Sequence, residues 1–348
     1  MNRINVAAML PRSRGIFAAM SALALTGTVS MGVQAAPFFV GLGDLPGGSI
    51  ESLISFGDNV ISNDGTTVVG RSSSANGPEA FRWTVESGMQ GLGDLPGGVP
   101  PQGFLSDARG TSTDGSVVVG TSVSSNGLEA FRWTQAGGMV GLGDLVFGGN
   151  SSEAYSVSAD GSVVVGRGDS VAGGEAFRWT EAEGMVGLGD LPGGLVSSEA
   201  RSVSADGDVV VGGGASSSGG EAFRWTASEG MIGLGDLPGG TFFSVANSIS
   251  ADGTVVAGWS RSGLGEQAFL WTEADGMIGL GDLPGGGFQS RAQSVSADGS
   301  VIVGWSDGGS IREAFLWNAT DGMRPLDEVL ENDFGFDLSG WVLSEALG

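Results

Sequence analysis

The side chains of this chain that could do chemistry are almost entirely carboxylates and arginines. The 348 residues include no Cys and no His, which removes thiolate nucleophiles, disulfides, histidine bases and Cys/His zinc sites. Lys is also missing, so all 15 basic residues are Arg, against 39 acids. Paired carboxylates, as used in glycoside hydrolysis, are therefore the one acid/base apparatus that the composition allows. Nucleic acid is not expected as a partner, because phosphate binding needs clustered positive charge.

The placement of the acids argues against catalysis and against metal binding. Most acids recur at equivalent positions of a repeat, in turn or strand-edge roles, whereas a catalytic acid usually breaks the pattern. Asp169 and Asp307 do break it, but both have turn-forming neighbours. The Asp-Gly turns lack the spacing of a calcium loop, and one carboxylate per turn cannot supply the roughly six oxygens that Ca²⁺ needs. We predict no catalytic residue, no metal site and no cofactor.

Two sets of side chains are the candidate ligand-binding residues. The first lies five residues before the Asp of each Asp-Gly turn and differs between copies, which is typical of a surface that recognises a ligand; a solvated rim is the alternative. The second is Trp259 and Trp305, where other copies have Arg, Thr or Gly; such indoles stack on sugar rings if exposed, or pack over a neighbouring repeat. The first set comprises Asn59, Arg109, Tyr155, Arg201, Asn247 and Gln293.

These residues belong to a repeat that begins with Gly-Leu-Gly-Asp-Leu. The phrase starts at Gly41, Gly91, Gly141, Gly187, Gly233 and Gly279, at spacings of 50 or 46 residues. A degraded copy at 323–330 is predicted to be one more fourth strand. Such units bury their apolar faces only against their neighbours. Taking 199–240 as the type unit, strands are predicted at 200–205, 209–212, 221–226 and 231–237, with a tight Asp206-Gly207 turn after the first. Four short strands of this kind form one blade of a β-propeller.

The predicted fold is all-β, a β-propeller of six complete four-stranded blades plus a split, incomplete seventh. Residues 38–45 read as a lone fourth strand, and 341–346 as a first strand without its successors, so we expect the chain to be truncated at the C-terminus. The Phe-x-Trp pairs of the third strands, such as Phe223 and Trp225, are predicted to pack between blades. A right-handed β-helix is the alternative, but its rungs are shorter than 46 residues.

The N-terminus carries an export signal. Arg3, Arg12 and Arg14 precede an apolar, small-residue stretch, and Val33-Gln34-Ala35 fits the cleavage rule. We predict a Sec-type signal peptide at 1–35 and a mature repeat domain at 36–348, secreted or displayed on the bacterial cell surface. No later stretch is apolar enough to span a bilayer.

The combined motifs resemble one family. Gly-Leu-Gly-Asp-Leu-Pro-Gly-Gly, Ser-x-Ala-Asp-Gly-x-Val-Val-Val-Gly and Ala-Phe-Arg-Trp-Thr, found between 38 and about 346, are similar to the bacterial HAF-repeat family of extracellular repeat proteins. The His that names the family is Glu or Gln here, as at Glu221 and Gln267, so no role of that imidazole carries over. The resemblance implies a secreted or surface-exposed protein with no established enzyme activity, and some members precede an autotransporter-type export barrel.

Three functions remain open. The preferred one is a non-catalytic recognition or adhesion module for an extracellular ligand, either a glycan or a cell-surface protein. The second is a structural passenger that precedes an export barrel lying beyond Gly348. The third is an extracellular glycan-acting enzyme that uses paired carboxylates. Binding to a glycan array separates the first from the second, and product release from polysaccharides would establish the third.

Overall fold

The computed structural model describes residues 6–8, 18–20, 40–53, 60–98, 105–146, 148–309, 311–339 and 342–347. These residues are nearly all β, in antiparallel sheets, with one helix. No helix among them has the length and apolar character needed to cross a membrane. The chain thus has the all-β composition that the repeats predict.

Six units of four antiparallel strands follow one another along the chain. Units 1 to 3 comprise β4 (Gly47–Leu53), β5 (Thr67–Ser74), β6 (Gly77–Thr84) and β7 (Gly88–Gly91); β8 (Ser106–Thr111), β9 (Val117–Ser124), β10 (Gly127–Thr134) and β11 (Gly138–Gly141); and β12 (Ser152–Val157), β13 (Val163–Ser170), β14 (Gly173–Thr180) and β15 (Gly184–Gly187). Units 4 to 6 comprise β16 (Gly193–Val203), β17 (Val209–Ser216), β18 (Gly219–Thr226) and β19 (Gly230–Gly233); β20 (Gly239–Ile249), β21 (Val255–Ser262), β22 (Glu266–Thr272) and β23 (Gly276–Gly281); and β24 (Ser290–Val295), β25 (Val301–Asp307), β26 (Arg312–Asn318) and β27 (Gly322–Pro325).

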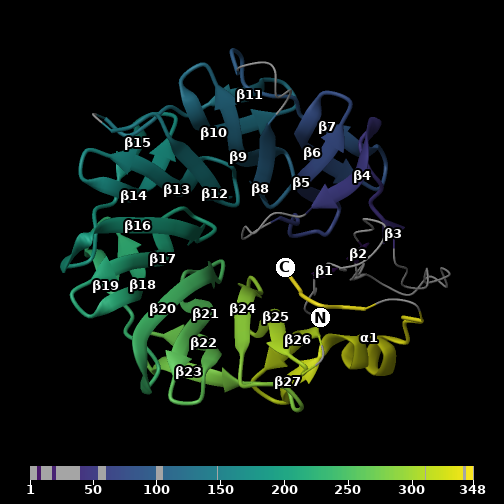
Figure 1. The fold of residues 1–348 in the computed structure, drawn as a ribbon, viewed down its shortest axis with the longest axis vertical. Helices are drawn as coiled ribbons and strands as arrows, with labels where there is room; N and C mark the ends of the chain where they lie inside the picture. The colour runs from purple at the N-terminus through teal and green to yellow at the C-terminus, as the bar shows by residue number, and fades with distance from the viewer. Residues whose placement is uncertain are drawn as a thin grey trace, which may run out of the picture.

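The units stand side by side around a central axis, and in units 2, 3 and 6 the strands follow one another from the innermost to the outermost (Figure 1). Within a unit, consecutive strands pair in order, as in β8-β9-β10-β11. Units 3, 4 and 5 are joined into one longer path by single parallel pairings, Gly174 with Ser197 and Gly220 with Phe243.

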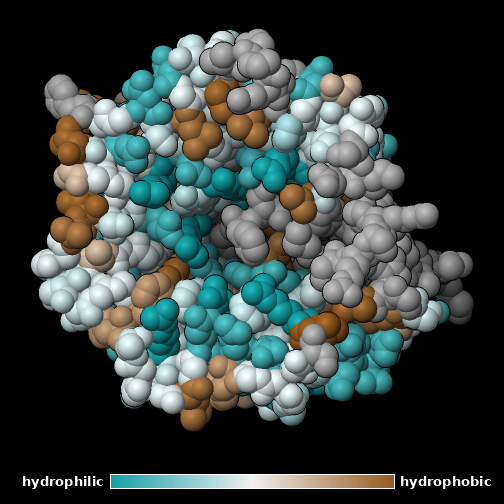
Figure 2. Space-filling view, viewed as in Figure 1, coloured by the Kyte–Doolittle hydropathy of each residue, from teal (hydrophilic) through white to brown (hydrophobic). Residues whose placement is uncertain are grey.

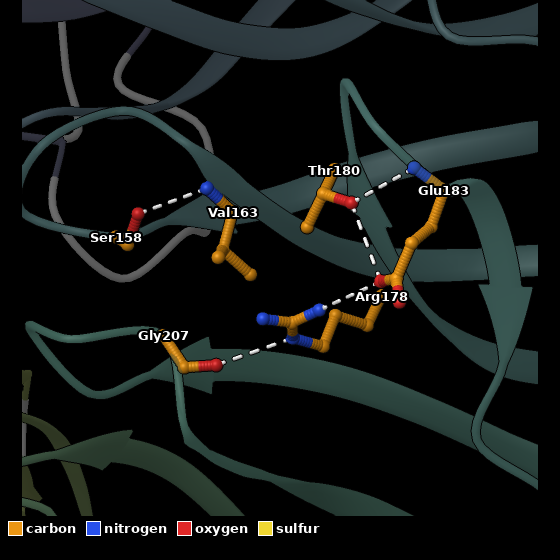
Figure 3. Close-up of polar contacts among 6 residues, drawn as sticks. All are labelled: Ser158, Val163, Arg178, Thr180, Glu183 and Gly207. Atoms are coloured by element: carbon orange, nitrogen blue, oxygen red, sulfur yellow. Dashed lines mark hydrogen bonds and ion pairs between the residues drawn. The ribbon is translucent and has the colours of Figure 1, made fainter.

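The turn between the first two strands of each unit has the chemistry that Asp-Gly predicts. In unit 3 the Asp160 carboxylate accepts hydrogen bonds from the Ser158 hydroxyl at 2.8 Å and the Ser162 N–H at 2.9 Å. The Ser158 hydroxyl accepts a bond from the Val163 N–H at 3.0 Å (Figure 3). Gly161 has a φ of 74°, which a residue with a side chain rarely adopts. The same bonds recur in the other five units.

These turns also link one unit to the next. The N–H of Ala159, just before Asp160, donates to the carbonyl of Ala205 in unit 4 at 3.1 Å, and Ala205 donates to Ala251 in unit 5 at 3.0 Å. Arg178 on β14 reaches the same neighbour, because its Nε donates to the Gly207 carbonyl at 3.2 Å (Figure 3). A belt of bonds between units thus runs around the face that carries the Asp-Gly turns.

The Gly-Leu-Gly phrase is explained by the glutamate that precedes the Ala-Phe-Arg-Trp motif, which is Glu175 in unit 3. A Cβ on Gly187 would lie 2.2 Å from Glu175 Oε1, so a side chain there would displace the carboxylate. The N–H of Gly189 donates to the same oxygen at 3.0 Å. The Gly189 carbonyl accepts a bond from the Ser198 hydroxyl at 2.8 Å, and this hydroxyl accepts one from the Ala176 N–H at 3.0 Å. The phrase therefore ties the end of unit 3 to the first strand of unit 4.

The aromatic residues of the third strands form the core between units, as predicted. All six Phe residues of the Phe-x-Trp pairs are fully buried. Phe177 of unit 3 packs in one cluster with Val119 and Ala130 of unit 2, and Phe223 of unit 4 with Val165 and Ala176 of unit 3. Each unit thus completes the core of the one before it.

One helix was not predicted. Where the sequence analysis expects only a degraded copy of the fourth strand, β27 is followed by α1 (Leu326–Phe334). Leu326, Val329 and Leu330 are buried against unit 6, acids occupy the first turn, and Gly335 ends the helix with a φ of 73°. The i, i+3, i+4 spacing of these apolar residues is the helical signal that the strand interpretation overlooked.

The sector between unit 6 and unit 1 differs in part from the prediction. The expected lone fourth strand is β3 (Val40–Gly41), and it pairs with β2 (Ala18–Met20), which pairs with β1 (Val6–Ala8). The segment 342–347, predicted as part of a first strand, forms no regular strand. It lies against unit 6, where the Ala314 N–H donates to the Leu343 carbonyl at 2.9 Å, and its Leu347 is buried in one cluster with Leu42 and Val60. Most of the predicted signal peptide lies outside the described residues.

Candidate functional site

A pocket of about 420 Å³ lies beside the central axis, lined mainly by residues of first and second strands. This is the face opposite the Asp-Gly turns, the one on which loops vary between copies. Hydrophilic side chains gather around the central hollow of the ring (Figure 2). Among the described residues the pocket is lined by Tyr155, Glu199, Arg201, Asn247, Trp259, Arg291, Gln293, Trp305, Arg312 and Leu347.

Six of the seven predicted ligand-binding residues that the structure describes line this pocket. They are Tyr155, Arg201, Asn247, Gln293, Trp259 and Trp305. Arg109 does not line it; its guanidinium bonds to Glu153 at 2.6 Å and lies 5.2 Å from the centre of the Tyr155 ring, so it supports the wall from unit 2. Asn59 lies outside the described residues. The variable positions of units 3 to 6 therefore converge on one pocket, to which unit 2 contributes only indirectly.

A β-bulge aims four of these side chains at the pocket. The strand registers shift between Ala154 and Ser156, and at the same position in β16, β20 and β24, so Tyr155, Arg201, Asn247 and Gln293 are the extra residues that have no partner in the ladder. A bulge redirects the side chain of the extra residue. The Gly that ends each Val-Val-Val-Gly run makes room: a Cβ on Gly166 would lie 1.9 Å from the Glu153 carbonyl oxygen.

The polar members of the pocket wall are joined by hydrogen bonds that cross from unit to unit. Arg201 donates to the Asn247 Oδ1 at 2.7 Å, Asn247 donates to the Gln293 Oε1 at 3.3 Å, and Gln293 donates to the Glu345 Oε1 at 2.7 Å. Arg201 is also held by Glu199, whose Oε1 lies 2.5 Å from Nη2. The predicted residues are thus an ordered polar wall and not an independently solvated rim.

The two tryptophans are buried, which agrees with the packing alternative and not with exposed stacking surfaces. Trp259 is 9% exposed and Trp305 is 2% exposed. The guanidinium of Arg291 lies 4.0 Å from the centre of the Trp259 ring, and that of Arg312 lies 4.0 Å from the centre of the Trp305 ring. The packing alternative is therefore the observed one, and arginines rather than indoles present their faces to the pocket.

Burial changes the titration of several groups around the pocket. Burial, together with the charges of Glu153 and Glu199, raises the pKa of Tyr155 to about 12. Burial also raises the pKa of Glu345, although a bond from Gln293 opposes it. For Glu266, burial opposes ionisation, but bonds from Arg291 and Gln289 outweigh it and lower the pKa. At neutral pH the tyrosine is therefore a neutral hydroxyl and Glu266 a carboxylate paired with Arg291.

Four pocket residues were not predicted from the sequence. Glu199 and Arg291 precede the bulged residue by two positions, Arg312 begins the third strand of unit 6, and Leu347 belongs to the C-terminal segment. Arg291 and Arg312 both carried a signal in their positions. Arg291 stands where units 3 and 4 have Glu153 and Glu199, and Arg312 stands where they have Gly174 and Gly220. Its contact with Trp305 depends on the pairing of β25 with β26, which places Asp307 opposite Arg312.

Comparisons with known proteins agree on the fold. No family model and no curated protein matches the chain. A protein from Bacteroides uniformis described as a 6-phosphogluconolactonase is similar, with a TM-score of 0.52 and 14% identity over 100% of this chain and 99% of that one. Prolyl oligopeptidase B from Galerina marginata has a TM-score of 0.57 and 8% identity over 92% of this chain and 47% of that one.

TolB from Acinetobacter baumannii is also similar, with a TM-score of 0.49 and 13% identity over 73% of this chain. The chain spans 61% of the length of that protein. The 6-phosphogluconolactonase-like neighbour is a β-propeller, and at such low identity the likeness shows the β-propeller fold and nothing of activity.

Proposed function

We propose that this protein is a non-catalytic recognition module of the cell exterior, which binds its ligand in the pocket beside the propeller axis. The observation that carries the proposal is the convergence of Tyr155, Arg201, Asn247 and Gln293 from four successive units on one pocket. Residues that vary between otherwise uniform repeats, and that meet at a hollow, are typical of a binding site on a rigid scaffold.

Two features of the chain extend this proposal. The six units are proposed to be blades, with a seventh blade begun by 342–347 on the inside and ended by β3 on the outside. The HAF-like motifs and the signal sequence at 1–35 support membership of that extracellular repeat family and export from the cell. In this arrangement the pocket opens on a secreted or surface-displayed protein, where glycans and cell-surface proteins are the available ligands.

The chemistry of the pocket favours binding over catalysis. Glycoside hydrolysis needs one carboxyl group that holds a proton and a second that is ionised, both facing the substrate. Among the described lining residues the one carboxylate is Glu199, and it is paired with Arg201. Glu345 bonds to Gln293 behind the wall. Glu199 is paired with an arginine and Glu345 does not line the pocket, so the two cannot act together as general acid and general base on a bound glycan. The glycan-acting enzyme is therefore the weaker alternative.

A glycan array tests the proposal with two variants of the repeat domain 36–348. The labelled wild type is expected to give saccharide hits that Asn247→Ala loses, because Asn247 lines the pocket. Arg261→Ala, at an exposed residue that does not line the pocket, should retain them. Melting temperatures measured in parallel show that both variants fold. Hits that survive Asn247→Ala, or release of reducing sugar from a bound polysaccharide, would contradict the proposal.

A further inference from the structure

The arginines of the pocket differ in how many of their hydrogen-bond donors are already bonded to other groups of the protein. Arg201 makes bonds to both Glu199 and Asn247, so its donors serve the wall. Arg291 gives Nε and Nη2 to a single oxygen of Glu266, at 3.0 Å and 2.6 Å. The Arg312 guanidinium has no hydrogen-bond or ion-pair partner among the described residues and is exposed. The free N–H donors of the pocket are therefore mainly those of Arg312, on one side of it.

That side lies over a single indole. The guanidinium groups of Arg312 and Arg291 lie 4.0 Å and 5.5 Å from the centre of the Trp305 ring. The ring is buried and holds both planar groups near one place. Two guanidinium groups fixed by an aromatic ring are preorganised donors, so little side-chain entropy is lost when they bind an anion.

The residues that line the pocket carry more positive than negative charge, although the chain has a net charge of −24: they include three Arg and one Glu. Glu199 pairs with Arg201 and Glu266 pairs with Arg291, whereas Arg312 interacts with the charge of Glu345 without forming an ion pair. A guanidinium with free donors matches a carboxylate in a two-bond geometry. The remaining lining groups, the Tyr155 hydroxyl and the amides of Asn247 and Gln293, are neutral and suit the hydroxyls of a sugar.

We propose that the pocket binds an acidic saccharide, a hexuronic acid residue whose carboxylate is held by Arg312 with help from Arg291. Asn247, Gln293 and Tyr155 face the hydroxyls of its ring. The proposal rests on the proposed function, since it names the ligand class of the same pocket. The volume of about 420 Å³ is within the range of sites that enclose one small ligand.

The test is calorimetric titration of the repeat domain 36–348 with digalacturonate and with its carboxyl-reduced form, in which each carboxylate is replaced by an uncharged hydroxymethyl group. Digalacturonate should bind and the reduced form should bind at least about tenfold more weakly, since one charge-assisted contact is worth that factor. Arg312→Gln should weaken digalacturonate binding about tenfold, and Arg312→Lys should restore part of it. Added salt should weaken binding further.

Arg261→Gln is the matched control. Arg261 also lies over an aromatic ring, 5.0 Å from the centre of Phe243, and is exposed, but it does not line the pocket. The affinity of the Arg261→Gln variant for digalacturonate should equal that of the wild type. A loss as large as that of Arg312→Gln would show that the charge of the face, and not the pocket, attracts the ligand, and would overturn the proposal.

Other outcomes separate the ligand class from the site. If the reduced disaccharide binds as tightly as digalacturonate and Arg312→Gln has no effect, the acidic class is wrong while recognition in the pocket stands. If a triglutamate peptide binds more tightly than digalacturonate, the saccharide class is wrong. If neither saccharide nor peptide binds, and Asn247→Ala leaves every array hit intact, the pocket is not the recognition site and both proposals fail.

Discussion

At the scale of single residues, each repeat contains side chains that accept hydrogen bonds from backbone N–H groups at the turns. Asp160 illustrates this, because one carboxylate accepts bonds from Ser158 and Ser162 while Ser158 serves Val163. The bonds from Ser162 and Ser158 stabilise the charged form and lower the pKa of Asp160. Equivalent bonds lower the pKa of the turn aspartates of the other units. In each of the six units, the hydrogen bonds that shape the turn therefore also stabilise the charged form of its aspartate.

This coupling predicts a loss of stability in acid. A carboxyl group whose pKa is lowered on folding stabilises the folded state above its unfolded pKa, near 3.8, and this contribution is lost as the pH falls through the folded pKa. Asp160→Asn should lower the free energy of unfolding by about 0.5–1 kcal/mol at pH 7, since the turn is exposed. At pH 2 the variant and the wild type should differ little. Urea unfolding at both pH values measures the difference.

The control for this experiment is Glu181→Gln, on the exposed turn after β14, whose carboxylate accepts no hydrogen bond among the described residues. It should leave the free energy of unfolding unchanged at both pH values. A deficit of Asp160→Asn that is the same at pH 7 and pH 2 would mean that charge does not contribute.

At the scale of elements, the strand pairing of each unit is shaped by one bulge and one glycine. The bulge places a variable side chain at the pocket, and the Gly in the middle of the second strand lets the partner carbonyl approach closely. The Gly of Val-Val-Val-Gly is therefore repeated because the partner carbonyl leaves no room for a side chain, whereas the residue on the bulge can differ between copies. This separation explains how uniform repeats carry an irregular site.

Gly166→Ala tests the close approach. Its Cβ would lie 1.9 Å from the Glu153 carbonyl oxygen, so the strands must separate, at a cost of about 3 kcal/mol or more. Gly184→Ala is the comparison, because this glycine has a φ of 70° with nothing within 4 Å of the added carbon; it should cost about 1 kcal/mol. Denaturant unfolding ranks the two. Equal costs would show that the bulge tolerates a side chain at this position.

At the scale of the whole molecule, each unit depends on its successor for a completed core, and unit 6 depends on the C-terminal part of the chain. Leu343 and Ala346 are buried in one cluster with Val303, Leu316 and α1. Ala346 also donates its N–H to the Gly304 carbonyl at 3.3 Å. The segment 342–347 therefore supports the unit that carries Trp305 and Arg312, and through Leu347 it closes one side of the pocket.

Leu343→Ala should reveal this dependence. The side chain is buried, so its truncation should lower the free energy of unfolding by about 2–3 kcal/mol. Its neighbour Val342 is 46% exposed, and Val342→Ala should change it by no more than about 0.5 kcal/mol. Hydrogen exchange at the Ala314 amide, which donates to the Leu343 carbonyl, should accelerate in Leu343→Ala alone. Unchanged exchange in that variant would contradict the support of unit 6 by this segment.

Local chemistry made much of this molecule predictable from its sequence. Asp-Gly turns, β-branched second strands and Phe-x-Trp third strands are properties of a few adjacent residues, and they specified the all-β units and the inter-unit core. Comparison of the repeated copies singled out Tyr155, Arg201, Asn247 and Gln293, because this position varies while its neighbours stay nearly the same. The helix α1 was missed because an expectation of one more repeat outweighed a short apolar pattern at helical spacing.

The pocket itself was decided only by the tertiary structure. Residues about 46 positions apart, such as Arg201 and Asn247, come within 2.7 Å because the units turn about an axis, and no local pattern states that angle. Arg291 and Arg312 cover Trp259 and Trp305 because strand pairing and neighbouring units bring them over the rings. The sequence determined which side chains each unit offers; the arrangement of the units determined which of them meet, which are buried and which donors remain free to bind a ligand.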